Sequence, residues 1–165
     1  MKQFWLVIQI ALLAMMSACS AATRQTPAAE LTSLEKARVS ITAYLDALSQ
    51  ANYDEAAKFY GGDVNLLQGY NPDIQEDDLP ALFERACMQN GFMCLPMKGI
   101  IAEQSLDDKN FVFEVEFLTR EGVLFEQGAC CGDDAARVSP ISRFSFRVQQ
   151  IGELYQVLDL PPYVP

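Results

Sequence analysis

The chain of 165 residues contains no histidine. Histidine has the ordinary pKa nearest to neutrality, and it supplies the general base of Ser-His-Asp and Cys-His sites and many ligands of catalytic zinc. Its absence excludes these mechanisms. Only carboxylate, tyrosine, lysine or cysteine chemistry remains for a catalytic site.

Basic residues are also scarce: 12 Lys and Arg stand against 22 Asp and Glu, a formal net charge of −10. Proteins that bind nucleic acids draw much of their affinity from Lys and Arg on the phosphate backbone. We therefore expect no nucleic-acid partner.

The apolar stretch 4–16, interrupted only by Gln9, is shorter than the roughly 20 residues that a membrane-spanning helix needs. It follows Lys2 and gives way at once to small residues. A positive start, a short apolar run and small residues form the layout of a secretory signal peptide. The sequence therefore predicts export.

The end of this segment, Met16-Ser17-Ala18-Cys19, resembles the lipobox of bacterial lipoproteins, in which an aliphatic residue and two small residues precede an acylated cysteine. Met16 stands where leucine is usual. We expect removal of residues 1–18, lipidation of Cys19, and a location in the bacterial cell envelope, anchored to a lipid bilayer outside the cytoplasm. The alternative is cleavage after Ser20-Ala21-Ala22, which would release a soluble secreted protein without Cys19.

Residues 19–31 are small or polar, lack apolar periodicity and are interpreted as a tether. Residues 32–165 have the size of one globular domain.

Three helices are predicted at the start of this domain. The first begins at the capping box Thr32-Ser33-Leu34-Glu35 and carries an apolar stripe. Asn52 is expected to cap a short second helix that Gly61-Gly62 end through a left-handed conformation. A loop with Asn71-Pro72 follows, and Asp77 or Asp78 caps a third helix with Pro80 in its first turn and a stop near Gly91.

From residue 95 onward the apolar pattern alternates, which predicts antiparallel strands. Every second residue from Phe111 to Phe117 is apolar, and these side chains are expected to face the core. The intervening Glu114 and Glu116 are expected to face solvent. Glu114 or Glu116 is expected opposite Arg143 or Arg147. The strands are predicted at 98–104, 111–117, 123–126, 141–149 and 154–160.

Helices followed by a strand meander predict an α+β fold, in which three N-terminal helices pack in a curved antiparallel sheet. The stretch Ile41 to Gly62, ITAYLDALSQANYDEAAKFYGG, resembles the opening of the nuclear transport factor 2-like superfamily, and 153–160 resembles its closing strand. The resemblance implies a SnoaL-like cone and is closest to bacterial lipoproteins of this fold. Sheet-to-sheet dimers are frequent in such proteins, which leaves a homodimer open.

Enzymes of this superfamily place a carboxylate with tyrosine or histidine groups inside the cone. Here Asp159 and Tyr44 could serve as base and oxyanion donor of an isomerase or cyclase. The alternative is that Tyr44 fills the core and Asp159 leads into an exposed Pro161-Pro162 end. We expect the latter, and therefore a non-catalytic domain that binds a small apolar ligand or a protein partner.

The four remaining cysteines, Cys87, Cys94, Cys130 and Cys131, predict disulfides in an exported domain. Pairing Cys87 with Cys94 would leave the adjacent pair strained or free, so we expect Cys87 and Cys94 to join Cys130 and Cys131 in either order. Adjacent cysteines do not supply the C-x-x-C knuckles of a zinc site, and Asp133-Asp134 disfavour a reactive thiolate. We expect no metal and no cofactor.

Overall fold

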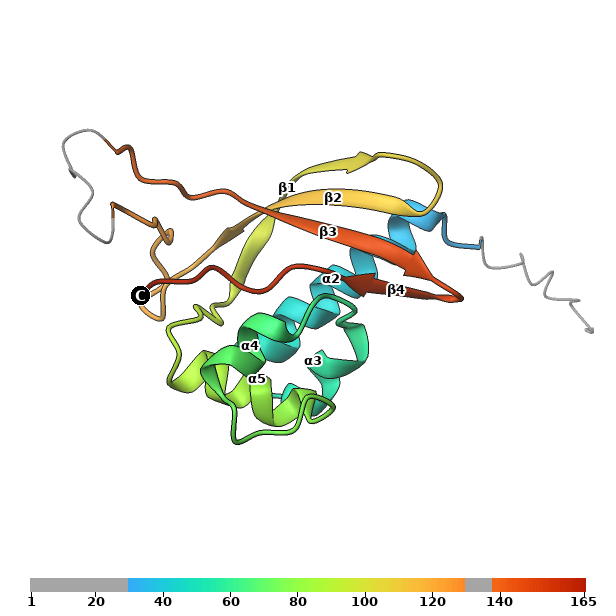
Figure 1. Ribbon diagram of the computed structural model, residues 1–165. Helices are drawn as coiled ribbons and strands as arrows, with labels where there is room; N and C mark the ends of the chain where they lie inside the picture. The colour runs from blue at the N-terminus through green and yellow to red at the C-terminus, as the bar shows by residue number, and fades with distance from the viewer. Residues whose placement is uncertain (1–29, 130–137) are drawn as a thin grey trace, which may run out of the picture. The chain divides into compact units, whose positions relative to one another are not determined.

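The computed structural model describes residues 30–129 and 138–165. The predicted signal segment, Cys19, and the pair Cys130 and Cys131 lie outside the described residues. Within these ranges the chain forms four helices followed by four strands of one antiparallel sheet (Figure 1). The predicted α+β class is confirmed. Among the described helices, none has the length and apolar character needed to cross a bilayer.

Helix α2, Ser33–Ser49, begins as the sequence predicts. The Thr32 hydroxyl accepts from the Glu35 amide, and the Glu35 carboxylate accepts from the Thr32 amide at 2.7 Å. This reciprocal pair satisfies amides that the first turn of a helix leaves without partners. One face of the helix is buried, as the apolar stripe predicts, with Ile41, Tyr44 and Leu45 almost fully excluded from solvent.

Three shorter helices follow: α3, Tyr53–Phe59; α4, Asn65–Tyr70; and α5, Leu79–Met88. Asp78 caps α5 by accepting from the Ala81 amide, as expected, whereas Asn52 holds the cap position of α3 without a side-chain hydrogen bond. Helix α4 lies where a loop was predicted. It has no side-chain cap, and the buried Asn71 completes its last turn by donating to the Leu67 carbonyl.

The sheet runs in the order β1, Met97–Ser105; β2, Asn110–Phe117; β3, Phe144–Ile151; and β4, Leu154–Val157. Burial alternates strictly along β2, which confirms its predicted parity. Phe113 lies opposite Phe146 on β3, and Phe111 lies opposite Val148. Figure 1 shows the helices gathered on one side of the sheet, with α2 lying along it.

Two predicted strands differ from the structure. Residues 123–126 form no strand: Leu124 makes only an isolated bridge to Leu118, because the chain closes a tight turn at Gly122 and then leaves the sheet. The strand predicted from Ile141 begins at Phe144, and Ile141 is joined only to Gln127.

The predicted cross-strand ion pairs are present in part. The Glu116 carboxylate lies 4.0 Å from the Arg143 guanidinium and 2.8 Å from the Lys98 ammonium. Arg147 turns instead to Asp159, beyond the end of β4. Exposed pairs of this kind contribute little to stability.

The prediction of a left-handed helix end at Gly61-Gly62 is wrong, because neither glycine has a positive φ. The need for glycine is steric. The Gly61 amide donates to the Val157 carbonyl at 2.9 Å, and a Cβ on Gly62 would overlap the carbonyl oxygen of Leu158 and lie 2.6 Å from the Tyr60 hydroxyl. Glycine permits this close approach of the loop after α3 to the chain after β4.

The predicted disulfide arrangement is also wrong: Cys87 is bonded to Cys94, with their Cα atoms 5.5 Å apart. Helix α5 ends one residue after Cys87, and the chain reverses at Gly91, whose φ is +82°. The reversal returns Cys94 to the helix end. A closed loop of this length contributes about 2.5 kcal/mol by restricting the unfolded chain.

The C-terminal tail is not the exposed end that the sequence suggested. Pro161 and Pro162 are buried. The tail pairs with the loop inside the disulfide ring, since the Met93 amide donates to the Pro162 carbonyl at 2.7 Å and the Val164 amide donates to the Gly91 carbonyl at 2.9 Å.

Replacing Gly62 by alanine tests the steric account of this loop. Gly62→Ala should lower the free energy of unfolding by about 2 kcal/mol, because the added methyl group must displace the Leu158 backbone or the Tyr60 ring. The matched control is Gly69→Ala in α4, where a Cβ would meet nothing within 4 Å and should be neutral or stabilising by up to about 1 kcal/mol. Equal urea midpoints for the two variants would contradict the account.

Candidate functional site

The interior between α2 and the sheet is filled by aromatic side chains. Six of these side chains, from α2, α5, β2 and β3, are almost fully buried: Tyr44, Phe83, Phe111, Phe113, Phe117 and Phe146. Their rings pack in contact geometry, for example Phe117 with Phe146 at a centroid distance of 6.0 Å. Interiors packed at such density hold few voids larger than a water molecule.

Tyr44, the predicted oxyanion donor, lies in this core with no exposed surface. Its ring stacks on Tyr60 at 5.9 Å and meets Phe83 edge-on at 6.0 Å. Its hydroxyl has no hydrogen-bond partner among the described residues. Burial raises the pKa of Tyr44 well above its usual value, with smaller contributions from Tyr60 and Asp159, so the phenol stays neutral.

Asp159, the predicted base, follows β4 and is bound by Arg147. Its carboxylate accepts from the Arg147 backbone amide at 2.6 Å and from two nitrogens of the guanidinium at 2.6 and 3.1 Å. The same hydrogen bonds raise the pKa of Arg147. Both oxygens of the carboxylate are therefore already occupied by hydrogen bonds from a single arginine.

The structure brings Tyr44 and Asp159 to the same side of the domain but does not join them. The charge of Asp159 helps to raise the pKa of both Tyr44 and Tyr60, but neither hydroxyl is bonded to its carboxylate. The Tyr60 hydroxyl donates to the Asp63 carbonyl at 2.8 Å, and the Tyr44 hydroxyl donates to no described group. In the structure, therefore, Tyr44 is part of the aromatic core, and Asp159 is the acidic partner of an ion pair with Arg147.

Several hollows open on the surface of the described residues, and two of them have extensive apolar walls. The first, which we name the disulfide cleft, has a volume of about 450 Å³. Apolar side chains and the Cys87–Cys94 bridge form most of its wall, while Thr119, Arg120 and Glu121 lie at its polar side. Its apolar members include Leu48, Met88, Phe92, Met93, Leu95 and Phe125.

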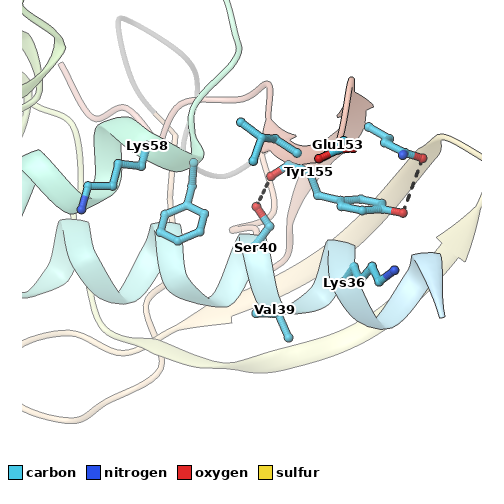
Figure 2. Close-up of a pocket in the computed structure, with 9 residues that line it drawn as sticks. Lys36, Val39, Ser40, Lys58, Glu153 and Tyr155 are labelled. Atoms are coloured by element: carbon cyan, nitrogen blue, oxygen red, sulfur yellow. Dashed lines mark hydrogen bonds between the residues drawn. The ribbon is translucent and has the colours of Figure 1, made fainter. Parts of the chain in front are cut away.

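The second hollow, which we name the helix groove, has a volume of about 690 Å³. Its lining includes Lys36, Val39 and Ser40 of α2, Lys58 of α3, and Glu153 and Tyr155 at the β3–β4 hairpin, which are labelled in Figure 2. The Ser40 hydroxyl donates to the Tyr155 carbonyl, which joins the helix to β4 across the floor.

The two hollows lie at opposite ends of α2. The helix groove uses the first two turns of that helix, and the disulfide cleft uses Leu48 and Ser49 in its last turn. A helix of this length separates its ends by about 25 Å. These two hollows are therefore distinct surfaces of the domain.

Sequence reasoning did not find either hollow. Each is lined by residues from three or more separate segments whose approach depends on the tertiary fold. Only the cysteines carried a local signal, and they were expected to bond elsewhere.

The unpartnered hydroxyl of Tyr44 gives a direct test of the core assignment. Tyr44→Phe should leave the free energy of unfolding unchanged or raise it by up to about 1 kcal/mol, because it removes a buried donor without a partner. Tyr60→Phe is the control and should lower it by about 1 kcal/mol, since it removes the bond to Asp63.

Tyr44 and Tyr60 also make the free energy of unfolding depend on pH, in a direction that follows from their raised pKa values. Burial raises the pKa of both tyrosines in the fold, so their contribution to stability is complete below the unfolded pKa of about 10 and is lost as pH rises above it. Urea unfolding of Tyr44→Phe should therefore vary less with pH above about 10. A loss of stability in Tyr44→Phe at neutral pH would show that the hydroxyl has a partner.

Comparison of the chain with protein-family models and with curated proteins finds no match.

Proposed function

We propose that the protein is an exported, lipid-anchored binding domain of the cell envelope, without catalytic activity, whose ligand or partner is recognised at the surface. The signal-like segment and its Cys19 support export and anchoring. The Cys87–Cys94 disulfide supports it independently, because disulfides persist in oxidising compartments outside the cytoplasm.

The proposal includes the fold family. A long first helix packed against an antiparallel meander is compatible with the cone of the nuclear transport factor 2-like superfamily. The cone and the family rest on the resemblance of residues 41–62 and 153–160. Fold alone would not assign an activity.

The observation that carries the proposal is the filled interior. An isomerase or cyclase acting through Asp159 and Tyr44 needs a substrate between the two groups. Tyr44 is enclosed by other aromatic rings, and Asp159 is bound to Arg147. The geometry thus favours surface binding over that alternative.

Of the two hollows, the disulfide cleft is suited to an apolar ligand. Phe92, Leu95 and Phe125 are buried at its base, and Met88, the last residue of α5, is 65% exposed at its edge. Methionine side chains adapt their shape to different apolar ligands. The disulfide fixes the segment that carries three of the wall residues, which lowers the entropy lost on binding.

A neutral environment-sensitive dye, Nile red, tests this site. The wild-type protein should enhance the emission of the dye, and Met88→Glu should weaken its binding at least about fivefold, because a carboxylate at the edge would be desolvated by the ligand. Leu66→Glu is the matched control: Leu66 is 53% exposed on α4 and does not line the cleft.

No enhancement by the wild type, or an equal loss in both variants, would contradict binding in the cleft. Circular dichroism of both variants checks that the fold is retained.

A further inference from the structure

The end of the domain that carries the helix groove also carries two turns of the sheet. In a meander of four antiparallel strands, the β1–β2 turn and the β3–β4 turn lie at the same end. The Gln150 amide donates to the Lys109 carbonyl at 2.8 Å, which joins the two turns directly. Figure 1 shows both turns beside the start of α2.

Five of the exposed large apolar side chains of the described residues belong to segments at this end. Leu106 in the first turn is 57% exposed, Leu154 after the second turn is 61% exposed, and Val39 on α2 is 57% exposed. Ile151 and Leu31 are also more than 40% exposed. We name these five residues the anchor face. Exposed apolar residues scattered singly need no explanation, but several on one end mark a contact surface.

The N-terminal chain joins the domain at this same end. Helix α2 begins at Ser33, directly after Leu31. Its first half is fixed against the sheet by the Arg38–Glu103 ion pair to β1 and by the Ser40 hydrogen bond to β4. From Cys19 to Leu31 the chain can reach at most about 40 Å, so a lipid on Cys19 would keep this end within that distance of the bilayer.

Charges of both signs surround the anchor face. Lys36 and Lys58 line the helix groove, and Lys109 lies in the first turn. Asp107 is close to Lys109 in sequence, and Glu35 is next to Lys36. Hydrogen bonds from Lys109 and Asn110 lower the pKa of Asp107, and hydrogen bonds with Thr32 lower that of Glu35, so both carboxyls stay ionised. A surface of mixed sign lacks the cluster of Lys and Arg that attracts anionic lipids, which leaves a zwitterionic bilayer as the surface to consider.

We infer that the anchor face docks on the surface of a zwitterionic lipid bilayer, with Leu106 and Leu154 inserted at the boundary of headgroups and acyl chains. The inference rests on the proposed lipid anchor. In this orientation the helix groove faces the bilayer, and the disulfide cleft, at the far end of α2, faces away from it and stays accessible. The anchor supplies proximity, and the apolar side chains supply orientation.

Tryptophan fluorescence can test this orientation without background. Trp5 is the only tryptophan of the chain and lies in the segment expected to be removed. Leu154→Trp places a reporter on the anchor face. Val123→Trp is the matched control, because Val123 is 62% exposed in the turn after β2, at the opposite end of that strand from Leu106. The lipidated mature proteins are reconstituted in phosphatidylcholine vesicles whose acyl chains are brominated near the headgroup.

Bromine quenches tryptophan at short range, so the emission of Leu154→Trp should fall by about half or more and that of Val123→Trp by less than about a tenth. Adding Leu106→Asp to Leu154→Trp should reduce the quenching, because the two turns insert together. Cosedimentation with the vesicles measures anchoring separately.

Protein that sediments with the vesicles but shows equal quenching, or none, at both positions overturns the docking and leaves the anchor standing. Protein that does not sediment with them overturns the lipid anchor and the docking with it.

Discussion

The packing of aromatic side chains from β2 against α2 is the interaction on which the rest of the structure depends. Every second residue of β2 points into the core, and three of these are phenylalanines. They belong to the same hydrophobic core as the buried stripe of α2, which includes Ile41 and Tyr44. Burial of large apolar side chains is the dominant favourable contribution to folding. Here it also leaves no described space for a substrate beside Tyr44.

The filled interior is the reason why the proposed binding function is placed at the surface. Tyr44 is enclosed and Asp159 is held by Arg147, whereas the disulfide cleft and the helix groove, at the two ends of α2, are open to solvent. One lies where the N-terminal chain enters, and the other lies beside the Cys87–Cys94 bridge. The proposed function assigns different tasks to them: contact with the membrane at the first and binding at the second.

Features encoded by neighbouring residues could be predicted from the sequence. The capping box at Thr32, the cap at Asp78 and the alternation along β2 are local, and all three are confirmed. Helix α4 was missed because its start has no side-chain cap and its end depends on Asn71, whose amide also donates to Asn90, far along the chain.

Features that depend on distant segments could not be predicted. The buried prolines at the C-terminus pair with the loop that the Cys87–Cys94 bond closes, far earlier in the chain. The bond itself is local, between cysteines seven residues apart, and it was missed because forming it was expected to leave the adjacent Cys130 and Cys131 strained or free. The candidate sites also depend on distant segments. Asp159 and Tyr44 were selected from strand parity and helix periodicity, and neither pattern reveals that Arg147 would bind the carboxylate.

The central claim is that this closed domain is held at a membrane by its N-terminus. The most direct test is the intact mass of the protein extracted from membranes, before and after reduction. The account predicts a chain that begins at Cys19 and carries a diacylglyceryl group, and that gains at least the two protons of the Cys87–Cys94 bridge on reduction. An unacylated chain, beginning at Met1 or after Ala22, would contradict it.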